Sequence, residues 1–151
     1  AKLEVAVGVG ATHMVCAADT DCVGQVRDLT GGGVDYAFDL AGSSDSMATA
    51  YGMVKYGGTV VAAGLPSLAT TVSINQCDLV GQEKAILGSY MGSCVPVRDI
   101  PRFIRLYLEG RLPVNRLIDG YIGYDGLNAG FDRLQEVKAI RQILTPHGVP
   151  S

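Results

Sequence analysis

Two short strand-like runs, each bounded by glycines, constrain the fold of this chain most. Residues 59–63 are almost wholly apolar and follow a glycine pair, and residues 34–40 form a second run that Gly42 closes. Apolar runs of this length are typical of strands in a parallel sheet that is covered on both faces. Between the two runs, residues 45–55 carry apolar side chains at helical spacing. The pattern therefore predicts an α/β fold with a parallel sheet and helical crossovers.

The same patterns predict elements along the rest of the chain. We expect Ser44 and Asp99 to cap the helices that follow them. The strict alternation of strands and helices ends near Gly92, so we expect residues 1–92 to form one domain and residues 93–151 a helix, strand, helix, strand segment. Further strands are expected at residues 12–17, 70–74, 84–91, 117–122 and 139–145, and further helices at residues 3–9, 21–29, 76–80, 101–109 and 126–137.

Charge and composition argue against several classes of function. The net charge of −3 offers no basic surface for nucleic acid or an anionic membrane. No apolar run approaches the roughly 20 residues that a membrane-spanning helix needs, and the first residues lack the regions of a signal peptide. The four cysteines form no C-x-x-C pair, and neither histidine lies at ligand spacing from them. We therefore expect free thiols in a cytoplasmic protein, with no metal site in this chain and neither nucleic acid nor membrane as a partner.

Two local patterns suggest chemistry of their own. Residues 5–10 look like the opening of a dinucleotide-binding turn, but His13 occupies the third glycine position, so we interpret the run as a helix followed by a turn. Asp35 and Asp39 alternate on one strand and share a face, which leaves open an acid/base pair of a small enzyme. Asp39 has the stronger functional case, because ligands collect at the carboxyl ends of parallel strands.

Read in order, several segments resemble the zinc-type medium-chain alcohol dehydrogenase family, in its C-terminal part. The resemblance spans nearly all 151 residues. It implies a partial doubly wound, Rossmann-like parallel sheet, followed by a C-terminal α+β segment of the family's catalytic domain. The segments that carry it are residues 10–13, 29–39, 57–61 with 64–66, 87–93 and 139–144.

The resemblance also implies a site for NAD or NADP that is held mostly by main-chain groups. An arginine fork suits two phosphate oxygens, and the family uses one at the pyrophosphate. The cofactor-binding positions are then Leu40, Ala41 and Gly42 on the adenosine side, Ala63, Gly64 and Leu65 beside the nicotinamide and its ribose, Ser89 and Met91 at the carboxamide, and Arg141 at the pyrophosphate.

A complete family member also has a zinc-bearing catalytic domain and a G-x-G-x-x-G turn, and the resemblance places both before Ala1. We therefore expect a fragment of an NAD-dependent alcohol dehydrogenase (an oxidoreductase that converts alcohol to aldehyde), inactive alone and without a catalytic residue. The alternative is a non-catalytic Rossmann-like binding or self-association module. Open strand edges predict a homo-oligomer through sheet edges, and the resemblance implies pairing of the strands at residues 84–91. Neither the substrate alcohol nor the choice of NAD or NADP follows from the sequence.

Overall fold

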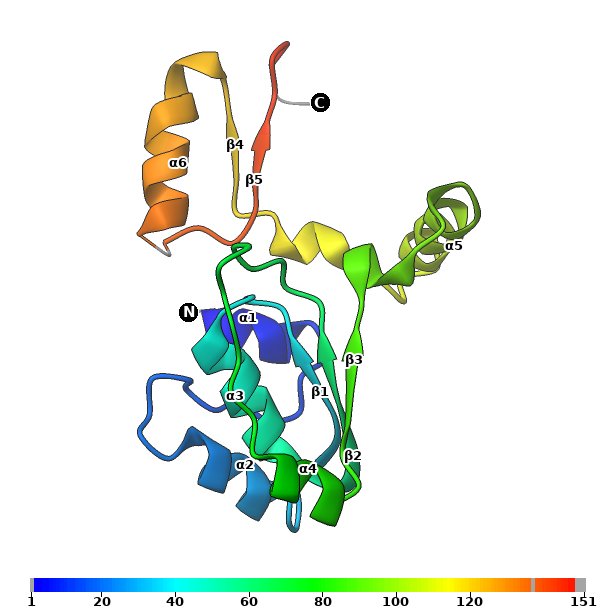
Figure 1. The fold of residues 1–151 in the computed structure, drawn as a ribbon. Helices are drawn as coiled ribbons and strands as arrows, with labels where there is room; N and C mark the ends of the chain where they lie inside the picture. Colours follow the sequence, from blue (N-terminus) through cyan, green and yellow to red (C-terminus); the bar gives the residue numbers. More distant parts are fainter. Residues whose placement is uncertain (1, 137, 149–151) are drawn as a thin grey trace. The chain divides into compact units, whose positions relative to one another are not determined.

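The computed structural model describes residues 2–136 and 138–148 (Figure 1). Contacts divide the chain into two compact units. The sheet unit is Val15–Pro96, and the terminal unit consists of the described parts of Ala1–Met14 and Val97–Ser151.

The sheet unit holds a three-stranded parallel sheet in the order β1-β2-β3. Helix α3 lies along one side of the sheet, and α2 packs against α3 (Figure 1). Parallel strands joined through helices confirm the predicted α/β class. In chain order the unit contains α2 (Cys22–Leu29), β1 (Val34–Asp39), α3 (Ser44–Met53), β2 (Val54–Ala62), α4 (Gln76–Gly81), β3 (Ala85–Gly88) and the 3-10 helix η1 (Tyr90–Ser93).

The core of the sheet unit forms where α3 meets β1 and β2. Val54 and Val60 of β2 are completely buried. The helix begins one residue earlier than expected, because Ser43 caps it and exchanges hydrogen bonds with Ser46 in a capping box. The core consists of Ala37, Met47, Ala50, Tyr51, Val54 and Val60.

Two expected strands do not form. Residues 12–17 and 70–74 contain no strand. The backbone groups of a strand need hydrogen-bond partners on a neighbouring strand. Among the described residues, the sheet pairs β1, β2 and β3 only with one another, so neither segment has such a neighbour. The second segment is instead tied down as a loop, with the Ser44 hydroxyl donating to the Thr71 carbonyl at 2.7 Å.

The terminal unit pairs β4 with β5 in parallel. Helix α6 lies beside β4 (Figure 1), and the Gln142 Nε2 of β5 donates to the Gly130 carbonyl of α6 at 2.8 Å. The domain division expected after residue 92 stays a prediction. No helix in the described part of the chain is long and apolar enough to cross a membrane. The remaining elements are α1 (Lys2–Gly8), α5 (Pro96–Leu108, from Val97 on in this unit), η2 (Val114–Leu117), β4 (Gly120–Ile122), η3 (Tyr124–Gly126), α6 (Leu127–Gln135) and β5 (Gln142–Leu144).

Candidate functional site

The turns that follow β1 and β2 meet at the carboxyl edge of the sheet. A Cβ atom on Gly64 would press against the Gly42 nitrogen and lie 2.8 Å from the Gly42 Cα. A Cβ on Gly42 would lie 3.0 Å from the Gly64 carbonyl carbon, and Gly42 also has a φ of +70°. Only glycine allows this approach, because the atoms in the way are backbone. Glycine at both positions therefore allows the backbones of the two turns to lie in direct contact at this edge.

Asp39, at the end of β1, holds both turns in place. Its Oδ1 accepts hydrogen bonds from the Ala41 and Gly42 amides at 3.0 and 3.3 Å. Its carbonyl accepts from the Ala63 and Gly64 amides, both at 2.8 Å. The residue is only 6% exposed. These hydrogen bonds account for a buried aspartate at this position, and no acid/base role of Asp39 is needed to explain it.

Asp35, the other residue of the conceivable acid/base pair, forms an ion pair with Lys55. Its carboxylate lies 2.6 Å from the Lys55 ammonium, and its side chain is 72% exposed. The hydrogen bond and charge of Lys55 lower the pKa of Asp35. An exposed carboxylate with a lowered pKa stays ionised at neutral pH and is a poor general base. The structure thus favours neither aspartate as a catalytic group.

A cavity of about 410 Å³ opens beside the turn after β2. Four of the predicted cofactor positions line it: Ala63, Gly64, Leu65 and Ser89. The Ser89 amide donates to the Ala62 carbonyl at 2.9 Å. The Ala63 carbonyl accepts no hydrogen bond from any described residue, so it is available to an amide donor. Small residues together with Leu65, Pro66 and Tyr90 thus border the cavity, beside an open carbonyl.

The other predicted positions lie apart from this cavity. Leu40 and Ala41 line a larger groove of about 580 Å³ along β1, and Gly42 lines a cavity of about 250 Å³ beneath the turns. Met91 lies in η1 with a φ of +49° and lines none of these cavities. Arg141 belongs to the terminal unit, where it is exposed and its carbonyl accepts from the Asp119 amide at 3.0 Å.

Sequence reasoning missed a charged cluster at the opposite end of the sheet unit. The Lys84 side chain is 3% exposed, and its Nζ lies 3.2 Å from the Asp78 Oδ2 and 4.5 Å from the centre of the Tyr51 ring. Gln82 also donates to Asp78. Burial first, and the Asp78 carboxylate second, raise the pKa of Tyr51 to about 12.

The pKa of Asp78 is lowered, mainly by the nearby Tyr51 hydroxyl and Lys84. The hydroxyl itself is buried without a partner at hydrogen-bonding geometry. None of the three residues lines the cavities described above. The one sequence feature that could have indicated this cluster is the i,i+4 spacing of Asp78 and Gln82.

No metal site forms among the described residues. They include no group of three or more His, Cys, Asp or Glu side chains that could hold an ion. A structural or catalytic zinc ion takes at least three such protein ligands. The described residues therefore do not fit a zinc site, and no chemical step is assigned to a metal here.

Comparisons with known proteins agree on one family. Residues 1–109 match the model described as zinc-binding dehydrogenase. A Mycobacterium tuberculosis protein with the provisional name alcohol dehydrogenase D is 37% identical over 147 residues, which cover 95% of this chain and 40% of that protein. The NDMA-dependent alcohol dehydrogenase of Amycolatopsis methanolica is 31% identical over 147 residues, covering 95% of this chain and 39% of that protein.

A solved structure matches over the same extent. Benzyl alcohol dehydrogenase from Acinetobacter calcoaceticus has a TM-score of 0.88 and 29% identity, covering 95% of this chain and 39% of that chain. The chain thus spans about 40% of the length of the curated relatives it matches. This likeness confirms the predicted fold class, an α/β fold with a partial Rossmann-like parallel sheet followed by a C-terminal α+β segment.

Proposed function

Because the chain belongs to the zinc-binding dehydrogenase family and corresponds to the C-terminal portion of its relatives, we propose that it forms the nicotinamide side of the cofactor site in an NAD-dependent alcohol dehydrogenase. The relatives are alcohol dehydrogenases, which makes oxidoreductase chemistry on an alcohol the reaction class. The main support is the cavity beside Ala63, where four of the predicted cofactor positions come together next to the glycine contact at the sheet edge.

In this proposal the chain binds and orients, and the cofactor supplies the acceptor for the hydride that leaves the alcohol carbon. The Ala63 carbonyl accepts a hydrogen bond from the carboxamide, while Asp39 keeps the Ala63 and Gly64 amides turned toward β1. Ser89 and Met91 contribute further main-chain groups. The absence of a side chain at Gly64 lets the turn after β2 lie against the Gly42 backbone, which positions Ala63 and Gly64 beside the cavity.

We propose roles in cofactor binding for the remaining predicted positions as well. Leu40, Ala41 and Gly42 form its adenosine side, with NAD or NADP as the cofactor. Arg141 binds the pyrophosphate through its guanidinium fork. The described residues include no zinc ligand set, and neither a carboxylate nor an imidazole lines the cavity, so we propose that the chain is inactive alone. We place it in the cytoplasm, as a homo-oligomer through sheet edges, without nucleic acid or membrane as a partner.

Calorimetry with NAD⁺ and NADH tests the binding claim. We expect dissociation constants below 1 mM, which corresponds to at least about 4 kcal/mol of binding free energy. Gly64→Ala should abolish the heat of binding, and Gly81→Ala should keep it, because Gly81 lies in α4 outside the cavity and a Cβ on it meets no atom within 4 Å. Binding weaker than millimolar for the unmodified chain would favour the alternative, a non-catalytic self-association module.

An absorbance assay tests the claim of inactivity. The purified chain is mixed with NAD⁺ and benzyl alcohol, the alcohol named for one structural neighbour, and NADH formation is followed. We expect no rise above a sample without protein, because the described residues include no ligand set that could hold zinc. A steady, alcohol-dependent rise would overturn this part of the proposal.

A further inference from the structure

The chain makes a left-handed turn shortly after β3. Met91, Gly92 and Ser93 have φ angles of +49°, +67° and +54°. Glycine adopts such angles freely, whereas a residue with a Cβ atom adopts them only at a cost in free energy. Gly92 therefore suits the middle of the turn, and the residues on either side of it are strained. Strain of this kind persists only where neighbouring contacts maintain it, and it is concentrated at functional sites.

Hydrogen bonds on both sides maintain this turn. Before it, Ser89 is extended, with a φ of −139°, and its amide donates to the Ala62 carbonyl of β2 at 2.9 Å. After it, Cys94 is extended, with a φ of −74°, and its amide donates to the Met91 carbonyl at 3.3 Å. The hydroxyl oxygens of Ser89 and Ser93 lie 3.4 Å apart, within hydrogen-bonding distance. This hydroxyl pair connects the anchored start of the turn to its strained end.

The turn lies next to the proposed nicotinamide end of the cofactor site. Ser89 and Tyr90 line the cavity beside the turn after β2, and Met91 is the next residue. The Met91 carbonyl already accepts from Cys94, which makes the Met91 amide the main-chain group that we assign to the ligand. The direction of this amide depends on the hand of the turn, because φ and ψ set the orientation of each planar peptide unit.

We propose that Ser93 is a positioning residue, an inference that rests on the proposed function. Its hydroxyl, through that of Ser89, keeps the turn left-handed, and the turn in that hand directs the Met91 main chain to the nicotinamide end of the cofactor. The Ser93 side chain itself touches no cofactor atom. It acts through the backbone conformation of residues 91–93.

Two substitutions of Ser93 separate its hydroxyl from its backbone conformation. The apparent affinity for a ligand falls with the fraction of chains in the binding conformation. Ser93→Ala removes the hydroxyl and keeps the strain, so that fraction should fall by the factor of about 2–10 that one hydrogen bond contributes. Ser93→Gly also removes the hydroxyl, but glycine adopts a positive φ about as readily as a negative one. The two variants therefore lose the same group and should bind differently.

Calorimetry with NAD⁺ measures this difference. We expect Ser93→Ala to weaken binding at least threefold and Ser93→Gly to bind within twofold of the native chain. Glu83→Gly is the matched control, because Glu83 is also an exposed residue with a positive φ, of +52°. It precedes Lys84 at the other end of β3 and does not line the cavity. It should leave the affinity for NAD⁺ unchanged.

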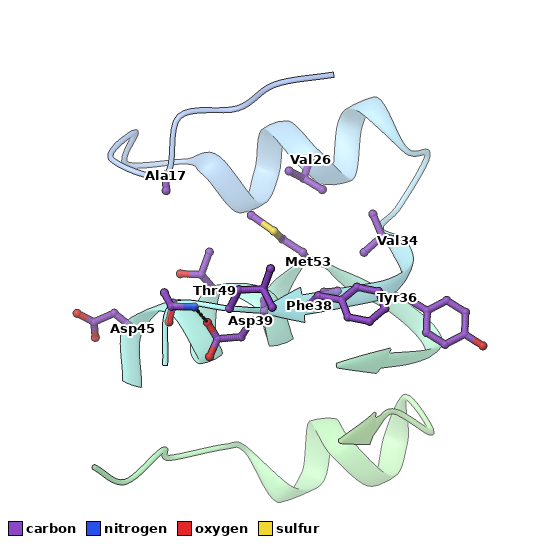
Figure 2. A pocket seen from close by; sticks show the side chains of 14 residues that line it. Ala17, Val26, Val34, Tyr36, Phe38, Asp39, Asp45, Thr49 and Met53 are labelled. Carbon is purple, nitrogen blue, oxygen red and sulfur yellow. Dashed lines mark hydrogen bonds between the residues drawn. The ribbon is translucent and has the colours of Figure 1, made fainter. Parts of the chain in front are cut away.

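ADP-ribose, which lacks the nicotinamide, distinguishes positioning from a general loss of structure. Its proposed contacts include Leu40, Ala41 and Gly42 on the adenosine side. Figure 2 shows Asp39 at the end of β1, where a dashed line marks the hydrogen bond that its carboxylate accepts from the Ala41 amide. The printed hydrogen bonds of Ser93 do not reach this turn. We therefore expect Ser93→Ala to bind ADP-ribose within twofold of the native chain.

Thermal melts test the turn itself, and we expect Ser93→Gly to melt at a higher temperature than Ser93→Ala. The inference is overturned if Ser93→Ala binds NAD⁺ as well as the native chain does, if it loses ADP-ribose equally, or if Ser93→Gly brings no recovery. Each of these results leaves the proposed function standing, because the native chain still binds NAD⁺. A native chain that binds no NAD⁺ would instead remove the proposed function and the positioning role together.

Discussion

The Lys84 ammonium nitrogen lies 4.5 Å from the centre of the Tyr51 ring, in the most buried charged cluster of the sheet unit. The same nitrogen lies 3.2 Å from Asp78. Tyr51 belongs to α3, Asp78 to α4, and Lys84 directly precedes β3. One buried cation therefore links three parts of the sheet unit, and its contacts fix where β3 begins.

Removing either charge of this pair should destabilise the protein, but unequally. The Lys84 side chain is 3% exposed and that of Asp78 is 28% exposed. Asp78→Asn leaves a buried ammonium without its counter-charge, whereas Lys84→Met leaves a carboxylate that water and Gln82 still solvate. We expect both variants to lower the Tm by several degrees and Asp78→Asn to lower it more, as measured by thermal melts at pH 7. The opposite order would contradict the burial argument.

Tyr51 should make the stability sensitive to alkaline pH. Its pKa is raised from 10.0 to about 12 in the folded chain. A group whose pKa is raised by folding contributes stability that is fully present below its unfolded pKa and is lost as the pH rises through its folded pKa. We expect the Tm to fall between pH 10 and pH 12 by several degrees more in the native chain than in Tyr51→Phe.

The same variant has a second readout at pH 7. The Tyr51 hydroxyl is buried without a hydrogen-bond partner at suitable geometry, so its removal should change the free energy of unfolding by less than about 1 kcal/mol. A loss well above that would show that the hydroxyl donates to Asp78 in solution. Equal alkaline sensitivity of the two proteins would remove Tyr51 as the titrating group.

Gly64→Ala should be costly where Gly88→Ala is not. The new Cβ would meet backbone atoms of Leu40 and Gly42 at about 2.8 Å or closer, and backbone cannot move aside as a flexible side chain does. We expect Gly64→Ala to lose about 1–3 kcal/mol of stability in denaturant unfolding. Gly88→Ala, with open space around its Cβ, should stay within about 0.5 kcal/mol of the native chain.

Variants of Asp39 separate a structural carboxylate from a catalytic one. Asp39→Asn keeps an oxygen that can accept from the Ala41 and Gly42 amides, so it should retain most of the stability and of any NAD⁺ binding. Asp39→Ala removes the acceptor and should lose about 1–3 kcal/mol. If Asp39→Asn proved as damaging as Asp39→Ala, the negative charge itself would be needed, and the acid/base alternative would regain support.

The strands of the sheet were predictable where their signals are local. The run predicted at residues 34–40 forms β1, which ends one residue earlier than expected. Its composition and the glycine that follows it are local signals, so the sequence alone was enough to locate this strand. Strand β2 instead begins at Val54, five residues before the expected start. Val54 pairs with Val34 across an irregular stretch of the ladder. That pairing depends on a distant part of the chain, so no local pattern announces it.

Helix α5 shows a start signal that was misassigned. The expected start was Pro101 with Asp99 as cap, but the helix begins at Pro96 and contains both residues. Proline is favoured at the first helical position, where its missing N–H is not needed, and Pro96 satisfies this rule as well as Pro101 does. Asp99 is 7% exposed, and both of its carboxylate oxygens accept hydrogen bonds from Arg98. Helix-capping preferences alone do not predict this ion pair.

The candidate site was predictable only through the family resemblance. Gly42 and Gly64, taken singly, do not indicate that their turns are in contact. They lie 22 positions apart in the sequence, and the sheet brings them together. The same holds for Tyr51 of α3 and Lys84, which directly precedes β3 and whose ammonium lies over the Tyr51 ring. Contacts of this kind come from tertiary packing, which no motif within a single segment encodes.

The small core of the sheet unit has a calorimetric consequence. Only Val54 and Val60 are completely shielded among the large side chains of the described residues, while Tyr36 and Phe38 remain in contact with water. The heat-capacity increment on unfolding grows with newly exposed apolar surface and averages about 1.8–2.3 kcal/mol/K for a domain of this length. A chain that hides so little from water should fall short of that value, so its free energy of unfolding should curve less strongly with temperature.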